Sequence, residues 1–160
     1  MVILLLLQVF FVGRYIVDGS SMEPNLYDQQ RILVNKIAYT FSDPQRGDVV
    51  VLTPPYPTQN DLIKRIIGLP GDTVEVKDGK VYINGVALDE PYIKDPPAYT
   101  FDETVVPEGE YFVLGDNRNN SSDSHFGWTV SRENIHGRAW FTIWPLSDWG
   151  SVLNFDYALP

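Results

Sequence analysis

The feature that most constrains the fold is a pair of short alternating segments, TVEVK at residues 73–77 and KVYI at residues 80–83. Apolar and polar side chains alternate in both, which is the period of a strand with one buried face. Asp78 and Gly79 join the two segments. An Asp-Gly pair between alternating segments is the strongest short-range signal of a β-hairpin, so this region is predicted to be antiparallel β structure.

The chain after residue 14 keeps this character, with short Val-, Ile- and Tyr-rich segments separated by Gly, Pro, Asp and Asn. Further strands are predicted at residues 31–34, 48–52, 62–67, 111–114 and 138–143. No convincing amphipathic helix is found between residues 15 and 145, and residues 53–59 and 89–103 are expected to be irregular. We predict a mostly β fold, an antiparallel β-sheet or barrel core with a small β-hairpin side lobe at about residues 73–105.

The N-terminus stands apart, because residues 2–12 read VILLLLQVFFV. This run is about half of the roughly 20 apolar residues with which a helix spans a bilayer. No basic residue precedes it and no small-x-small site follows it, which disfavours a cleaved secretory signal. We interpret residues 1–14 as a truncated hydrophobic membrane anchor ahead of a domain at residues 15–160. A buried or interfacial helix of that domain is the alternative.

Charge and composition exclude several classes of function. The formal net charge is -9, and no basic cluster is present that could displace counterions from nucleic-acid phosphates. The absence of cysteine excludes disulfides, thiolate metal sites and cysteine nucleophiles. Two histidines leave little for a zinc site. A chain of 160 residues fits one domain.

The first candidate for chemistry is the segment DGSSMEPNL at residues 18–26. Gly19 permits unusual backbone angles and Pro24 stiffens the exit, so the loop can present the Ser21 hydroxyl beside a backbone N–H. An ordinary Ser-rich turn is the bland interpretation of this segment alone. A serine hydroxyl needs a base within reach before it becomes a nucleophile.

Two kinds of base are available in this sequence. A Ser-His-Asp triad would use His125, in a loop after Asp123, or His136, for which a structural role is more common. The other base is Lys64, which strand alternation places on the same side as Leu62 and Ile66. A free lysine has a pKa of about 10.4, so it acts as a base only if burial lowers that pKa. An exposed lysine on a poorly patterned strand is the bland interpretation.

A buried neutral lysine needs hydrogen-bond partners, and residues 114–125, LGDNRNNSSDSH, are a polar run that can supply them. Most such runs are simply loops. The value of this one lies in its combination with the serine and lysine segments.

Together these segments resemble the type I signal peptidase family, over about residues 13–145. The motifs in order are SMEP at 21–24, RGDVVV at 46–51, KRIIGLPGD at 64–72 and GDNRNNSSDS at 115–124. Each motif is weak alone, but all of them in this order behind an apolar N-terminus are highly specific.

The resemblance implies a serine endopeptidase with a Ser-Lys dyad. Ser21 would be the nucleophile, Lys64 the general base, and Ser121 would hydrogen-bond and orient the lysine amine. Asp123 would hold the site together electrostatically through Arg65. The reaction implied is removal of signal peptides from exported preproteins after small-x-small motifs, with no metal or cofactor.

Two positions depart from the family pattern. Gly19 stands where some members have a serine that helps to form the oxyanion hole, so the hole would rely on backbone N–H groups, chiefly that of Ser21. His125 stands where the family often has Arg, so an ion pair with Asp123 would be weaker or pH-dependent here.

Apolar character and the resemblance together suggest Met22, Ile32, Val51 and Ile63 as walls of the substrate pockets. The partners implied are preproteins and a lipid bilayer, with the catalytic domain on the extracytoplasmic face of the bacterial plasma membrane. Exposed aromatics such as Trp144, Trp149 and Phe155 could seat the domain at the lipid surface.

Two other functions compete with this interpretation. One is the self-cleaving repressor type of Ser-Lys peptidase, which would lack the anchor and carry a DNA-binding domain, and neither condition fits this sequence. The other is a membrane-tethered β domain that binds extended peptides without catalysis.

Overall fold

The computed structural model describes residues 11–157 of the chain. Within that range, the elements are strands and three single-turn 3-10 helices, η1 (Ser124–Phe126), η2 (Arg132–Asn134) and η3 (Leu146–Asp148). The larger of two sheets consists of β1 (Val12–Ile16), β2 (Arg31–Asn35), β3 (Val49–Leu52), β4 (Leu62–Gly68), β9 (Glu110–Leu114), β10 (Val130–Ser131), β11 (Ile135–Trp144) and β12 (Gly150–Ser151). The prediction of a mostly β fold is confirmed.

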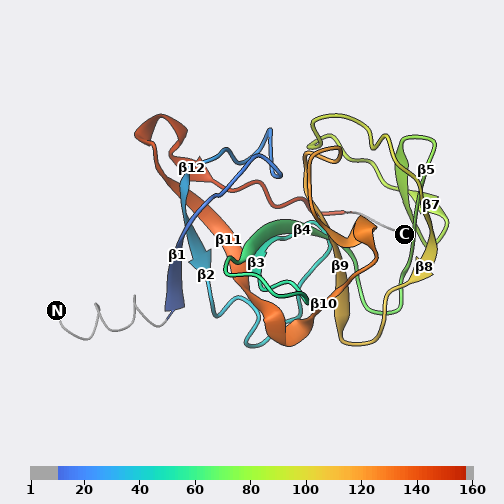
Figure 1. The fold of residues 1–160 in the computed structure, drawn as a ribbon. Coiled ribbons are helices and arrows are strands. Elements are labelled where there is room, and N and C mark those ends of the chain that lie inside the picture. The colour runs from blue at the N-terminus through green and yellow to red at the C-terminus, as the bar shows by residue number, and fades with distance from the viewer. Residues whose placement is uncertain (1–10, 158–160) are drawn as a thin grey trace.

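The larger sheet is antiparallel and curls into an open half-barrel, with the order β1-β2-β11-β3-β4-β9-β10 and β12 paired to β11. Strand β11 is long enough to pair with β2, β3 and β12, and it crosses the sheet diagonally in Figure 1. Register shifts interrupt its pairing with β2. Such bulges bend a strand and increase its twist, which accounts for the curl.

The smaller sheet has the order β7-β6-β5-β8, with β5 (Thr73–Lys77), β6 (Lys80–Ile83), β7 (Val86–Ala87) and β8 (Phe101–Val105). The predicted Asp-Gly hairpin joins β5 and β6, and Asp78 and Gly79 have φ of 51° and 71°, as a two-residue hairpin turn requires. Strand β8 begins inside the region that the sequence predicted to be irregular. Most of its side chains are exposed, so burial gives it no alternating pattern, and pairing with β5 defines it.

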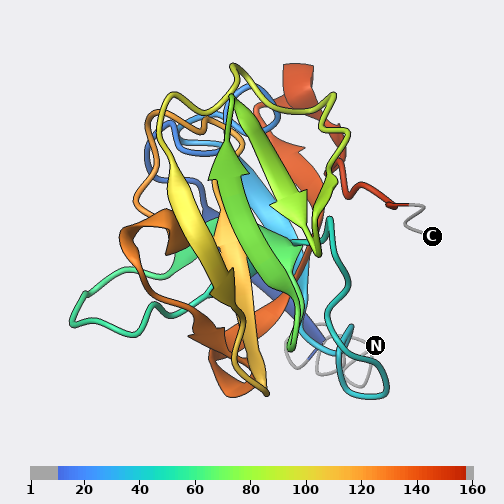
Figure 2. The same cartoon turned by 90° about the vertical axis from the view of Figure 1, so that its right-hand side faces the viewer.

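The smaller sheet packs against one end of the larger one, and Figure 2 shows it in front of the strands of that sheet. A shared apolar cluster joins them, with Val74, Val76 and Ile83 from the smaller sheet and Phe112 and Leu114 from β9. A second cluster joins the segment after β1 to β2, β3 and β11, with Met22, Ile32, Val51 and Ala139 among its members. Both clusters back onto the segments that carry the candidate site.

Most of the predicted anchor, residues 1–10, lies outside the described residues. Its last residues belong to β1, in which Val12 is paired with Asn35 and Ile16 with Arg31. Among the described residues, the structure contains no helix of the length and apolar character that a membrane crossing requires.

Candidate active site

Ser21 lies in the loop that follows β1. The loop is closed at its base, where the Val17 N–H donates to Gln30 O at 2.8 Å. Gly19 has a φ of 84°, a left-handed conformation that glycine adopts without steric cost. Its N–H donates to Asp28 Oδ1 at 2.8 Å. These contacts set the turn that presents Ser21.

Lys64 reaches Ser21 from strand β4, where it is paired with Val50 of β3. Lys64 Nζ donates to Ser21 Oγ at 2.8 Å and to Ile63 O at 3.1 Å. The lysine is only 3% exposed, although 43 residues separate it from the serine in sequence. The two candidates that the sequence selected are therefore in direct contact.

Burial lowers the pKa of Lys64 to about 8, against a smaller opposing effect of the Asp123 and Asp116 charges. The cause is desolvation, which disfavours the charged ammonium. A lysine with this pKa is neutral in a large fraction of molecules near pH 8. Once neutral, the amine can accept the Ser21 hydroxyl proton across the contact that already exists.

The polar loop after β9 holds the serine loop in place. The Asn117 N–H donates to Ser21 O at 2.9 Å, and Asn117 Nδ2 donates to Ser20 O at 3.0 Å. Asn120 Nδ2 donates to Ser20 Oγ at 2.8 Å. Sequence reasoning expected this loop to serve the lysine, and it missed these asparagines because their partners are 97 and 100 residues away.

Ser121 lies beside the dyad. The predicted hydrogen bond between its hydroxyl and the lysine amine is not present among the described residues. Ser121 Oγ is buried and has no hydrogen-bond partner among residues 11–157. A Cβ at Gly115 would overlap both Ser121 Oγ and Ser21 O. The glycine therefore allows the two serine-bearing loops to approach each other.

The predicted link from Asp123 to Arg65 is wrong. Asp123 Oδ2 accepts from the Gly115 N–H at 2.9 Å, and Oδ1 lies 2.6 Å from His125 Nδ1. Arg65 points to the opposite face of β4 from Lys64, because successive strand residues alternate. Asp123 thus acts on the lysine through its charge and on the loop through its hydrogen bonds.

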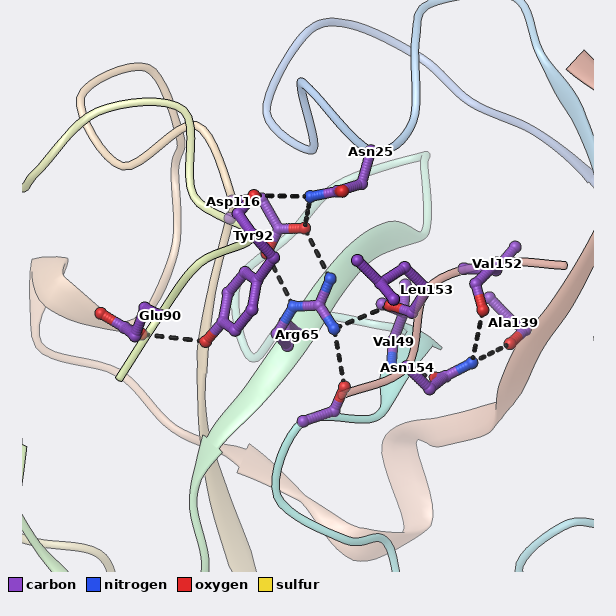
Figure 3. A network of polar contacts seen from close by, with 12 residues as sticks. Asn25, Val49, Arg65, Glu90, Tyr92, Asp116, Ala139, Val152, Leu153 and Asn154 are labelled. Carbon is purple, nitrogen blue, oxygen red and sulfur yellow. Dashed lines mark hydrogen bonds and ion pairs between the residues drawn. The ribbon is translucent and has the colours of Figure 1, made fainter. Parts of the chain in front are cut away.

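Arg65 is instead held by Asp116, a residue that the sequence reasoning did not select. Arg65 Nε and Nη2 donate to the two Asp116 carboxylate oxygens at 2.8 and 2.7 Å. Arg65 Nη1 donates to Gly47 O and Leu153 O. The guanidinium also lies over the Tyr92 ring, 4.1 Å from its centroid. Figure 3 shows this network, which raises the pKa of Arg65 through the Asp116 contacts despite burial.

The sequence held one signal for this pair. Asp116 follows β9, and β9 is paired with β4 so that Leu114 lies opposite Arg65. A correct pairing of the two strands would have placed the carboxylate beside the guanidinium.

Two hollows meet at Ser21, and Asp18 and Ser21 line both. The narrow hollow, of about 170 Å³, is bounded by Ile16, Met22, Leu62, Ile63 and Lys64 among others. The wide cleft, of about 800 Å³, lies between the serine loop, residues 98–99 and residues 118–126.

The predicted pocket residues divide into two pairs. Met22 and Ile63 line the narrow hollow. Ile32 and Val51 do not line it; they are fully buried in the core cluster that Met22 also joins. Apolar character identified the four residues as a group. Only the folded structure distinguishes the two that line the hollow from the two that lie in the core.

Neither histidine contacts Ser21 among the described residues. His125 is bound to Asp123, and His136 Nε2 lies 2.7 Å from Thr53 Oγ1. Within the same range, no group of three or more His, Cys, Asp or Glu side chains is placed to hold a metal ion. The contact between Lys64 Nζ and Ser21 Oγ supports proton transfer between a buried amine and a hydroxyl.

Comparison with known proteins gives one consistent family. A family model described as signal peptidase, peptidase S26, matches residues 1–144. The Synechocystis protein "Probable signal peptidase I-2" is 50% identical over 139 residues, which cover 84% of this chain and 63% of that protein. The Bacillus subtilis protein "Signal peptidase I S" is 39% identical over 161 residues, covering 92% and 85%.

A solved structure extends the similarity to the fold. The crystal structure of a signal peptidase I from Enterococcus faecalis has a TM-score of 0.55 and 38% identity. The match covers 61% of this chain and 97% of that one.

Proposed function

The chain belongs to the signal peptidase I family of serine endopeptidases, peptidase S26, and on that premise we propose that it removes signal peptides with Ser21 as nucleophile and Lys64 as general base. The observation that carries the proposal is the 2.8 Å contact between Lys64 Nζ and Ser21 Oγ. Burial of the amine lowers its pKa to about 8, which makes it a usable base near neutral pH.

The reaction proceeds through an acyl-enzyme. Neutral Lys64 takes the proton of Ser21, whose oxygen attacks the scissile carbonyl and forms a tetrahedral intermediate. The protonated amine then donates to the leaving amino group, and water hydrolyses the resulting ester with Lys64 again as base. Neither step needs a metal or a cofactor.

The oxyanion hole relies on the main chain. The Ser21 N–H has no hydrogen-bond partner within residues 11–157, so it is free to donate to the developing oxyanion. The Gly19 N–H is already bound to Asp28, and Gly19 has no hydroxyl to contribute. Preorganised donors of this kind are among the largest contributions to catalysis by acyl-transfer enzymes.

An unpaired strand edge supports the binding of an extended substrate. Residues 62–64 of β4 are paired with β3 on one side, whereas the pairing with β9 on the other side begins only at Arg65. The narrow hollow lies along this free edge, between it and the end of β1. An extended peptide can add a strand there, with small side chains before the cut facing Met22 and Ile63.

We further propose that the domain acts at the extracytoplasmic face of the plasma membrane, with the apolar residues ahead of β1 as its anchor. Trp144 and Trp149 are 50% and 63% exposed, and such aromatic side chains favour the membrane interface. Phe155 is less suited to this role, because its ring packs against Tyr92 and Tyr157.

The test is cleavage of a preprotein with a small-x-small site, in detergent or lipid. Wild type is compared with Ser21→Ala and Lys64→Met, and with Lys80→Met as a control at an exposed lysine. We expect both dyad variants to lose about 10³-fold or more in kcat while remaining folded by circular dichroism.

Two results would contradict the proposal. Near-wild-type activity of Lys64→Met would move the base elsewhere, with His125 as the next candidate. Binding of the preprotein by folded wild type without cleavage would favour a tethered domain that binds extended peptides.

A further inference from the structure

The wide cleft beside Ser21 has no role in the chemistry described above. It is about 800 Å³ and far exceeds the narrow hollow of about 170 Å³ on the other side of the serine. Its walls come from the serine loop, from the segment ahead of β8, and from the loop that contains η1. The cleft is therefore a composite of parts that are distant in sequence.

One wall of the cleft is aromatic. The His125 ring stacks on Tyr99, with ring centroids 4.1 Å apart and an interplanar angle of 17°. The Phe126 ring also contacts His125, with centroids 4.1 Å apart and a tilt of 39°. Phe126 is 68% exposed, although burial of a phenyl ring away from water is favourable. An exposed ring at the end of a stack offers a contact surface to an apolar or planar side chain.

The wall is held rigidly before any substrate binds. Asp123 fixes the His125 ring through the contact at 2.6 Å. The segment ahead of β8 is attached to the same loop by two bonds: the Ala98 N–H donates to Asn119 Oδ1 at 2.7 Å, and Asn119 Nδ2 donates to Pro96 O at 3.0 Å. A preorganised surface of this kind loses little conformational entropy on binding.

The position of the cleft indicates which part of the substrate it binds. If the segment before the cut lies along the free edge of β4, then its last carbonyl is at Ser21 and the chain beyond must leave on the other side. Asp18 and Ser21 line both hollows, so the two are continuous at the nucleophile.

We propose that the wide cleft binds the first residues of the mature protein, and that Phe126, His125 and Tyr99 favour a large apolar or aromatic side chain among them. This inference rests on the proposed function, because it assigns the second half of the same substrate. It makes Phe126 a specificity-determining residue that contacts the part of the preprotein that is released.

The test uses peptides that share the residues before the cut. One ends there as a methyl ester and has no mature residues. The others continue with ten residues that are all small and polar, or that carry a single Phe at the first, second or third mature position.

We expect wild type to cleave at least one Phe peptide with a kcat/KM about tenfold above the all-polar peptide, in line with a good aromatic contact. Phe126→Ala should abolish that preference and leave hydrolysis of the methyl ester unchanged within about twofold. Phe41→Ala is the matched control, because Phe41 is 98% exposed and is not a wall of the cleft.

Three results would overturn the inference. Absence of any Phe preference in wild type would do so. An equal loss on the ester and on the extended peptides would mean that Phe126 positions the dyad rather than the mature segment. Failure of wild type to cleave either kind of peptide would reject the proposed function itself. This outcome differs from the other two because wild type then does not hydrolyse even the methyl ester.

Discussion

Lys64 and Arg65 are consecutive, both buried and both cationic when protonated, yet strand β4 places them in opposite environments. Lys64 has a hydroxyl and a carbonyl as its partners. Arg65 has a bidentate carboxylate, two carbonyls and an aromatic face. The pKa of the lysine is lowered to about 8, and that of the arginine is raised.

The difference teaches how one strand can carry both a reactive base and a structural cation. A lysine can lose its proton, so a site without a contacting carboxylate drives it to the neutral form. An arginine stays charged at any ordinary pH, so its burial requires a complete set of acceptors. Three changes test whether these two environments have the opposite effects that this comparison implies.

The largest effect is expected when the arginine loses its carboxylate. Asp116→Ala leaves the buried Arg65 charge without a counter-ion and removes one of the two acceptors of Asn25 Nδ2. We expect a loss of about 3–5 kcal/mol in the free energy of unfolding, measured by urea denaturation.

A double variant and a surface control sharpen this result. Arg65→Met combined with Asp116→Leu should be more stable than Asp116→Ala alone, because no buried charge remains. Glu75→Ala, which breaks the exposed pair with Lys77, should leave the free energy of unfolding near that of wild type. A negligible effect of Asp116→Ala would contradict the contrast between the two faces.

The next effect is expected from removal of the lysine charge. The pKa of Lys64 is lower in the folded state, about 8, than its ordinary value of 10.5. Burial of the protonated amine therefore lowers the free energy of unfolding of wild type. This loss is complete below pH 8 and disappears as the pH rises to 10.5. Lys64→Met should thus be more stable than wild type by about 3 kcal/mol at pH 7.

Thermal or urea unfolding across the pH range measures this difference. The stability gap between Lys64→Met and wild type should close between pH 8 and pH 10.5. Lys80→Met, at an exposed position, should show no such pH-dependent gap. A variant that is less stable than wild type at pH 7 would argue that the lysine is not desolvated.

The smallest effect is expected from the charge of Asp123, which raises the pKa of Lys64 against the larger effect of burial. Asp123→Asn keeps an oxygen acceptor for the Gly115 N–H but removes the negative charge. The pKa of the lysine should fall, so the rising limb of the pH–rate profile should move to lower pH. Asp102→Asn, on exposed β8, should leave the profile unchanged, and a shift to higher pH would oppose this account.

The sequence predicted most strands because their period is local. Val49–Leu52, buried on both faces, and the Asp-Gly hairpin could each be identified from their own residues. Strands β7, β10 and β12 are only two residues long, too short to carry a period. The last part of the predicted anchor became strand β1, because its backbone is paired with β2.

The same division applies to the site. Ser21 and Lys64 were selected because their motifs are local in sequence and resemble those of the signal peptidase family, and alternation placed Lys64 on one face of β4. The partners of Arg65 and Ser20 were not found, because these contacts depend on how β9 and its following loop pack against β4 and the serine loop. The bond from the Gly115 N–H to Asp123 lies within that loop and was also missed.

The sequence alone determined the mostly β fold, the candidate nucleophile and the candidate base, since turns, alternation and motifs need only neighbouring residues. The tertiary structure decided which carboxylate neutralises Arg65, how far Lys64 is desolvated, and which apolar residues line the hollow at Ser21. Those properties depend on contacts between strands distant in sequence and on the water that the assembled core excludes, and no single segment encodes them.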